Sequence, residues 1–246
     1  MVRFIYVIIM RIGSIIYFVP CMKKYAKNIE RYTEEDCHRL AQRMIAKVAK
    51  TARITTCVRG RLVLPTEGGY ILYANHQGKW DALGIMSGHD RPCRVLMDKK
   101  RSEMPLANEF IDLIRGKRID RGNIRQQARC LREIADEVRE GHVYLIFPEG
   151  GYGKHQGNRL GKFRTGCFRA AYDAQCPVVP VALVDSYRPF GENSLRHVKT
   201  EVHFLPPIAY EDYKDIKPAE LAAMVRCRIE EKIREVTEGE GRVSAA

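Results

Sequence analysis

Short apolar runs rich in β-branched and aromatic residues alternate with longer amphipathic stretches along most of this 246-residue chain. Runs of the first kind are typical of buried strands, and stretches of the second kind are typical of helices. The predicted strands cover residues 70–74, 94–97, 143–147, 178–184 and 203–205, and the predicted helices cover residues 80–87, 105–114, 123–140 and 219–236. Such alternation favours a mostly parallel sheet flanked by helices on both faces, so the sequence predicts an α/β fold.

A histidine and an aspartate, His76 and Asp81, follow the strand predicted at residues 70–74. If Gly78 lets the chain turn and a helix begins near Trp80, the carboxylate can reach back to the imidazole. That contact would fix the tautomer of His76 and leave its other ring nitrogen as a proton acceptor. The simpler alternative is a hydrogen-bonded loop pair without a catalytic role. Because no Gly-x-Ser-x-Gly or cysteine nucleophile motif is present, the catalytic interpretation predicts direct transfer to an acceptor that His76 activates.

Three further blocks follow in a fixed order. They are Arg115-Gly116-Lys117-Arg118-Ile119-Asp120-Arg121, Phe147-Pro148-Glu149-Gly150-Gly151 and Cys176-Pro177-Val178-Val179-Pro180-Val181-Ala182-Leu183. With the block from Asn75 to Asp81 they form the ordered set NHxxxxD, IDR, FPEGG and VPVAL, between about residues 60 and 185. This set resembles the glycerolipid acyltransferases, most closely the bacterial 1-acyl-sn-glycerol-3-phosphate acyltransferases. Four motifs in order are far more specific than any one of them.

The resemblance implies that His76 is the general base and that Asp81 orients it. The implied reaction moves a fatty acyl group from a thioester, acyl-CoA or acyl carrier protein, to the free hydroxyl of 1-acyl-sn-glycerol 3-phosphate. The product is phosphatidic acid, in phospholipid biosynthesis. No metal or other cofactor is expected, because the thioester is already activated and the base is an imidazole.

The acceptor site implied by the resemblance uses Arg121, Glu149 and Gly150, and we add Gly151 and Asn75 from the same blocks as substrate-binding candidates. The planar guanidinium of Arg121 suits a phosphate, although a solvated basic loop would look the same in sequence. Glu149 follows the strand predicted at residues 143–147. The two glycines after it would allow a ligand close to the backbone.

The third block departs from the family pattern. The family usually continues with Thr-Arg-Ser, whereas Gly151-Tyr152-Gly153 stands here, so an arginine expected near the phosphate is missing. The candidates to replace it are Lys154, Arg159, Lys162 and Arg164, and Arg164 belongs to a stretch that resembles a later family element. Lys99, upstream of Pro105, is a further phosphate-binding candidate. An acyltransferase acting on another hydroxyl or amine acceptor, for example glycerol 3-phosphate, therefore stays open.

The composition and net charge of the chain limit the classes of partner that it can bind. A chain of this length can bury one core, and its net charge of +12 indicates an anionic partner. An anionic phospholipid surface and an acidic acyl carrier both fit this charge. A nucleic-acid-binding protein is disfavoured, since no RNP, KH or zinc-finger pattern is present. A catalytically silent membrane-associated homologue is the other alternative. The eight scattered cysteines are typical of reduced thiols in a cytosol-facing protein.

The first 32 residues are predicted to be a hydrophobic membrane-associating segment, and residues 33–246 the acyltransferase domain. Two apolar runs, residues 4–10 and 12–22, are separated by Arg11 and followed by Lys23 and Lys24. The favoured interpretation is an interfacial or half-inserted helix with Arg3, Arg11 and the lysine pair at the headgroups, on the cytoplasmic face of the cell membrane. A single transmembrane helix and a helix packed on the protein's own core remain alternatives. A cleaved signal peptide is disfavoured.

Overall fold

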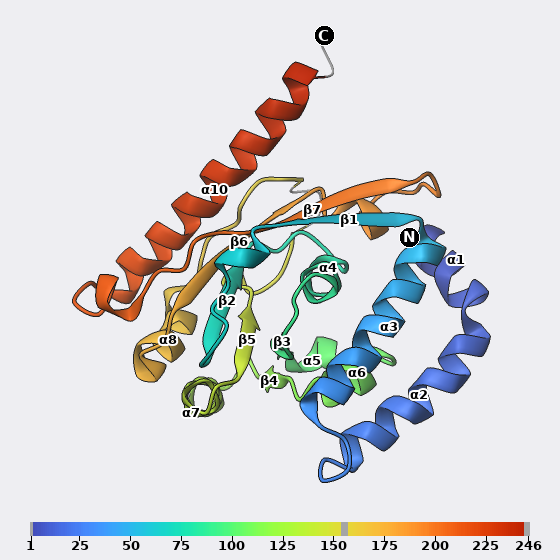
Figure 1. Ribbon diagram of the computed structural model, residues 1–246, viewed down its shortest axis with the longest axis horizontal. Coiled ribbons are helices and arrows are strands. Elements are labelled where there is room, and N and C mark those ends of the chain that lie inside the picture. Colours follow the sequence, from blue (N-terminus) through green and yellow to red (C-terminus); the bar gives the residue numbers. More distant parts are fainter. Residues whose placement is uncertain (1, 154–156, 244–246) are drawn as a thin grey trace.

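A seven-stranded sheet forms the centre of the protein in a computed structural model that describes residues 2–153 and 157–243, with side chains through residue 239 (Figure 1). The strands are β1 (Ile54–Arg59), β2 (Tyr70–Ala74), β3 (Cys93–Asp98), β4 (Lys117–Ile119), β5 (Val143–Ile146), β6 (Val178–Val184) and β7 (Val198–Phe204). Their order across the sheet is β1-β7-β6-β2-β5-β3-β4. Only the β6–β7 pair is antiparallel among these strands, so the predicted α/β class with a mostly parallel sheet is confirmed.

Helices cover both faces of this sheet (Figure 1). They are α1 (Val2–Met10), α2 (Ile12–Lys27), α3 (Glu34–Ala52), α4 (Asp81–Ser87), α5 (Lys99–Ser102), α6 (Ala107–Leu113), α7 (Ile124–Arg139), α8 (Arg169–Ala174), α9 (Arg188–Gly191) and α10 (Pro218–Val243). Short 3₁₀ turns lie at Arg61–Val63, Thr165–Phe168 and Tyr210–Asp212.

Strand β2 shows how the sheet divides the core. All five of its residues are buried, as a parallel strand covered on both faces requires. Tyr70, Leu72 and Ala74 join the apolar cluster that also contains residues of α3, α4 and α6. Ile71 and Tyr73, which point the opposite way, join the cluster with residues of α7, α8 and α10. The loop that carries His76 and Asp81 therefore follows a strand that is fixed from both sides.

Most predicted elements appear close to their expected positions. Helix α3 begins after Thr33, whose hydroxyl accepts the N–H of Asp36 while the Asp36 side chain accepts the N–H of Thr33. Three strand predictions need correction: β7 begins at Val198, five residues earlier than expected, and β1 and β4 were not expected. The last helix, α10, extends beyond the predicted residue 236 to Val243.

The two N-terminal helices pack on the rest of the protein along one side. Val7, Phe18 and Met22 belong to the same apolar cluster as α3. Arg3 is fully buried and donates to the carbonyl oxygens of Pro189, at 2.9 Å, and Arg196. The expectation that Arg3 meets lipid headgroups is therefore wrong, because its guanidinium is used inside the protein.

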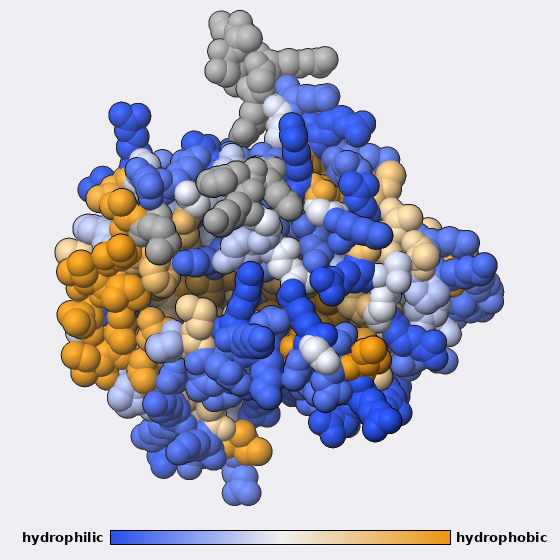
Figure 2. All heavy atoms as spheres, turned by 180° about the vertical axis from the view of Figure 1, so that it is seen from behind, coloured by the Kyte–Doolittle hydropathy of each residue, from blue (hydrophilic) through white to orange (hydrophobic). Residues whose placement is uncertain are grey.

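The other side of these helices is apolar and exposed. The exposed residues are Val2, Ile5, Ile9, Met10, Ile12, Ile16 and Tyr17. Figure 2 shows them as a continuous apolar area at the N-terminal end of the molecule. Within the described residues no single helix is long and apolar enough to cross a membrane, whereas α1 and α2 pass that test together with a bend of 77° between them.

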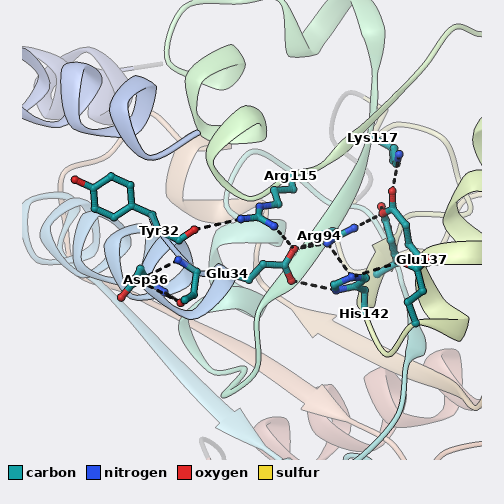
Figure 3. Close-up of polar contacts among 11 residues, drawn as sticks. Tyr32, Glu34, Asp36, Arg94, Arg115, Lys117, Glu137 and His142 are labelled. Atoms are coloured by element: carbon teal, nitrogen blue, oxygen red, sulfur yellow. Dashed lines mark hydrogen bonds and ion pairs between the residues drawn. The ribbon is translucent and has the colours of Figure 1, made fainter. Parts of the chain in front are cut away.

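A polar network ties together elements at the edge of the sheet where β3 and β5 begin (Figure 3). At its centre the Arg94 guanidinium donates to the carboxylates of Glu34, with an Nε–Oε1 distance of 3.0 Å, and Glu137. Lys117 pairs with Glu137 at 2.7 Å, and His142 lies 3.1 Å from Glu34. The network joins α3, β3, β4 and α7 at the end of the sheet where the parallel strands start. His76 and Glu149 follow the other ends of these parallel strands.

Candidate active site

Two neighbouring parallel strands deliver the main motifs to the same edge of the sheet. Strand β2 pairs with β5 so that Tyr73 lies opposite Ile146. The chain leaving β2 carries His76, and the chain leaving β5 carries Phe147 to Gly151. Motifs about seventy residues apart in sequence are thereby brought together, at the strand ends where α/β proteins usually place their ligands.

The His76 and Asp81 side chains form a hydrogen bond, as their spacing predicted. Nδ1 of His76 lies 2.7 Å from Oδ2 of Asp81. The carboxylate is fully buried, whereas 17% of the imidazole is exposed. Since a carboxylate accepts the hydrogen bond, the proton is on Nδ1 and Nε2 carries the free lone pair. The arrangement can accept a proton from an approaching hydroxyl and then stabilise the imidazolium.

The buried Asp81 carboxylate is held by more than the histidine. The same oxygen, Oδ2, also accepts the backbone N–H groups of Gln77 and of Gly78, the latter at 2.8 Å. Oδ1 accepts the Ser186 hydroxyl at 2.7 Å. Four donors thus fix this carboxylate. Because Asp81 is the first residue of α4, the positive end of that helix also stabilises its negative charge.

Ser186 and Gln77 are site residues that the sequence prediction missed. The Gln77 side chain accepts the Ser186 N–H at 2.8 Å and donates to the carbonyl of Leu183 at 3.0 Å. Both residues thus link the His76 loop to the end of β6. The sequence signal that could have identified Ser186 is its position, two residues after the strand formed by the VPVAL block.

Aromatic rings surround the imidazole. The Phe147 ring stacks on it with centroids 4.3 Å apart and an interplanar angle of 23°. The Tyr152 ring contacts it edge-to-face, with centroids 4.7 Å apart and an angle of 85°. The guanidinium carbon of Arg101 in turn lies 5.0 Å from the centre of the Tyr152 ring.

Glu149 contacts the backbone on both sides of the site. One carboxylate oxygen accepts the N–H of His76 at 2.9 Å, and the other accepts the N–H of Gly161 at 3.0 Å. Burial raises the pKa of Glu149 above its usual value, although these two hydrogen bonds act in the opposite direction. The side chain therefore fixes the backbone of His76. Its predicted contact with the acceptor stays a prediction.

Two arginines lie against the glycines of the third block. Gly150 and Gly151 both have positive φ, 72° and 154°. A Cβ on Gly150 would lie 3.0 Å from Nε of Arg164, and a Cβ on Gly151 would lie 3.8 Å from the terminal nitrogens of Arg121. The predicted acceptor residues Arg121, Gly150, Gly151 and Arg164 are therefore brought together. Two guanidinium groups beside a half-buried glycine turn can bind a phosphate.

The remaining candidates occupy different positions. Both amide atoms of the buried Asn75 side chain bond to the backbone of Leu183, at 3.1 and 2.8 Å, so the residue links β2 to β6. Lys99 is exposed at the start of α5, next to Asp98, which pairs with Arg121 at 2.9 Å. Lys154 lies outside the described residues. Substrate binding by Asn75 and Lys99 stays a prediction.

Comparisons with known proteins place the chain in a family. A sequence profile of the acyltransferase family matches residues 55–184, more than half of the chain. The chain is 29% identical over 170 residues to the 1-acyl-sn-glycerol-3-phosphate acyltransferase of Escherichia coli strain K12, covering 69% of each protein. It is 26% identical over 228 residues to the human 1-acyl-sn-glycerol-3-phosphate acyltransferase alpha, covering 91% of this chain and 77% of that protein.

The fold is shared with a solved structure as well. The crystal structure of the 1-acyl-sn-glycerophosphate acyltransferase from Thermotoga maritima superimposes with a TM-score of 0.77. The match covers 95% of this chain and 94% of that chain at 17% sequence identity. At this identity the match shows a common fold.

Proposed function

The chain belongs to the acyltransferase family, and from this we propose that it transfers a fatty acyl group from a thioester to the free hydroxyl of 1-acyl-sn-glycerol 3-phosphate. The product would be phosphatidic acid. The proposal is supported by the names of its relatives, among them the Escherichia coli and human proteins. It is also supported by a site in which His76 pairs with Asp81 and two arginines lie against the glycines that follow Glu149. Acyl-CoA and acyl carrier protein are the two proposed donors.

The observation that carries the proposal is the hydrogen bond between His76 and Asp81. At 2.7 Å it fixes the Nδ1–H tautomer, so the lone pair of Nε2 is available to a substrate. Nε2 removes the proton of the acceptor hydroxyl as the oxygen attacks the thioester carbonyl carbon. The tetrahedral intermediate then collapses, the carbon–sulfur bond breaks, and the imidazolium returns the proton to the departing thiolate. No metal or further cofactor takes part in these steps.

The acceptor phosphate is proposed to bind between Arg121 and Arg164. The two side chains lie against adjacent residues, Gly151 and Gly150, so their charges are close to each other. Asp98 pairs with Nε of Arg121, so within residues 2–153 and 157–239 the terminal nitrogens are left to face a ligand. A phosphate that bridges both arginines would hold the acceptor beside the turn that contains Glu149. The Glu149 carboxylate accepts the backbone N–H of His76, so this turn also contacts the proposed base.

A membrane surface is the proposed location, with the N-terminal segment as the contact. Helix α1 touches the catalytic loop, because Nζ of Lys79 lies 4.4 Å from the centre of the Phe4 ring. Phe4 also packs on Phe190 of α9, with ring centroids 5.8 Å apart. An apolar face that contacts a bilayer would thus bring the active site near the lipid that supplies its acceptor. The net charge of +12 favours anionic lipid and the cytoplasmic face.

The test is a product assay with purified protein in phospholipid vesicles. Labelled long-chain acyl-CoA or acyl carrier protein is supplied with 1-acyl-sn-glycerol 3-phosphate, glycerol 3-phosphate or no acceptor. Wild type is expected to form phosphatidic acid. His76→Ala should reduce its rate by about 10²–10⁴-fold, the usual contribution of a positioned general base, and should leave the unfolding temperature nearly unchanged.

His197→Ala is the matched control, because His197 is exposed and its imidazole hydrogen-bonds to Thr55, outside the site. This variant should retain full activity. Product only from another acceptor would favour the alternative reaction of the family. No product from wild type with any acceptor, in vesicles that it binds, would favour a catalytically silent homologue. Substantial turnover by His76→Ala would remove His76 from the role of base.

A further inference from the structure

Tyr152 is the only residue with a side chain in the segment Gly150-Gly151-Tyr152-Gly153. Its last three residues, Gly151-Tyr152-Gly153, occupy the place where the family pattern continues Thr-Arg-Ser. The Tyr152 ring is half-buried and contacts the His76 imidazole at 4.7 Å between centroids. The segment has no other side chain, and it places this one large ring against the proposed base.

The contact with Tyr152 adds a third restraint on the imidazole. Phe147 covers one face of the ring at 4.3 Å, and Asp81 holds Nδ1 at 2.7 Å. Tyr152 adds a perpendicular ring, at an angle of 85°. Rotation about the side-chain torsions of His76 is therefore limited by packing as well as by the hydrogen bond to Asp81. A catalytic group is effective when its neighbours restrict it to the productive orientation.

Arg101 holds the Tyr152 ring in place. Its guanidinium carbon lies 5.0 Å from the ring centre, within the range of a favourable cation–π contact. The backbone of Arg101 is fixed too, since its N–H donates to Oδ1 of Asp98 at 3.2 Å. The other oxygen of Asp98 pairs with Arg121. The ring is thereby connected to α5 and, through Asp98, to Arg121.

We infer that Tyr152, held by Arg101, is a positioning residue that keeps the His76 imidazole aligned with the acceptor hydroxyl. The inference rests on the proposed function. The ring also occupies space beside the imidazole that water would otherwise fill, so it favours transfer to the acceptor over hydrolysis of the thioester. It acts through the shape and position of the ring, and the hydroxyl of Tyr152 is not required.

The first experiment compares Tyr152→Ala with Tyr152→Phe. Tyr152→Ala is expected to lower kcat about tenfold, to change the acceptor KM less than twofold, and to raise the ratio of free fatty acid to acylated product. Tyr152→Phe keeps the ring and should remain within about twofold of wild type. If Tyr152→Phe loses as much as Tyr152→Ala, or if only the KM changes, the inference is wrong.

Tyr210→Ala is the matched control, because it removes a half-buried tyrosine whose ring contacts Tyr213, in the cluster on the other face of the sheet. Its kcat and its product ratio should equal those of wild type. Thermal unfolding of each variant separates loss of positioning from loss of fold. A Tyr210→Ala variant that lowers kcat equally would show that the effect is general, and would overturn the inference.

A double-substitution cycle tests the part assigned to Arg101. Arg101→Ala should lower kcat in the wild-type background and have little further effect in Tyr152→Ala, because its effect passes through the ring. An Arg101 effect of full size in the Tyr152→Ala background would instead mean that the guanidinium acts on a ligand directly. Lys100→Ala, at an exposed neighbouring position, should change neither background.

A measurement without substrate separates this inference from the proposed function. The imidazole proton resonances of His76, identified by their loss in His76→Ala, should shift in Tyr152→Ala and stay nearly unchanged in Tyr210→Ala, because the adjacent ring is removed only in the first. Unshifted resonances would overturn the contact. If the resonances shift but wild type forms no phosphatidic acid, the proposed reaction fails while the positioning of His76 by Tyr152 stands.

Discussion

At the scale of single residues, the two arginines beside Gly150 and Gly151 give a testable division of roles. Arg121→Ala is expected to raise the KM for a phosphorylated acceptor about tenfold or more, with a smaller change in kcat, because a guanidinium–phosphate pair is lost and the base is untouched. Steady-state kinetics at varied acceptor concentration would measure this. Arg125→Ala, an exposed arginine in the first turn of α7, serves as the control and should not alter KM. An unchanged acceptor dependence in Arg121→Ala would make Arg121 structural.

Residue identity predicted the His76–Asp81 pair well, because a five-residue spacing with a glycine between them leaves few ways for the side chains to lie. It did not predict the backbone partners of Asn75 and Glu149. Each side chain uses both polar atoms on backbone groups of segments distant in sequence, Leu183 for Asn75 and Gly161 together with His76 for Glu149. Such long-range partners depend on how strands are ordered in the sheet, and a motif does not contain that order.

At the scale of elements, the network around Arg94 holds α3, β3 and α7 together. The Arg94 side chain is 9% exposed and pairs with both Glu34 and Glu137. Arg94→Met should lower the free energy of unfolding by about 3–5 kcal/mol, since it leaves two carboxylates without their buried partner. Urea unfolding would measure the loss. Arg129→Met removes an arginine that is 70% exposed and pairs with Glu133 on the same helix, so it should cost under about 1 kcal/mol.

The same network determines whether the free energy of unfolding rises or falls with pH. Pairing with Lys117, Tyr144 and Arg94 lowers the pKa of Glu137 below its usual value, although burial acts in the opposite direction. The stabilisation is therefore present above the pKa of an unfolded glutamate, about 4.3, and is lost as the pH falls through the lowered folded value. Arg94→Met should lose less stability than wild type over that acidic range. An equal loss would mean that Arg94 does not stabilise the ionised carboxylate.

The elements that the sequence did not predict share a physical cause. Strand β4 is three residues long and two of them are charged, so it has no apolar run, and it exists because Leu96 to Asp98 of β3 offer a partner. Strand β1 is fully buried only at Ile54 and pairs with β7 alone at the edge of the sheet. Central strands such as β2 and β6 are buried at every position and were predicted with correct bounds.

At the scale of the whole molecule, the exposed apolar face of α1 and α2 is the part of the surface most suited to a bilayer (Figure 2). Removing residues 1–22 would be a poor test, because Val7, Phe18 and Met22 belong to the core. Single substitutions on the exposed face avoid this problem. Ile9 and Ile16 are 64% and 70% exposed, so a charge there costs the folded protein little.

The variant Ile9→Asp with Ile16→Asp is expected to bind vesicles of anionic phospholipid at least about tenfold more weakly than wild type, because two apolar side chains no longer enter the bilayer and two charges must be kept out of it. Sedimentation with vesicles measures the partition, and thermal unfolding checks that the fold is retained. Ile124→Asp is the control: Ile124 is 82% exposed on α7 and should leave binding unchanged. Binding by Ile9→Asp/Ile16→Asp equal to that of wild type would place the membrane contact elsewhere on the protein. Weaker binding with a matching fall in phosphatidic acid formation would instead link the apolar face to delivery of the acceptor. The contact between Phe4 of α1 and Lys79, in the loop that carries His76, predicts this second outcome.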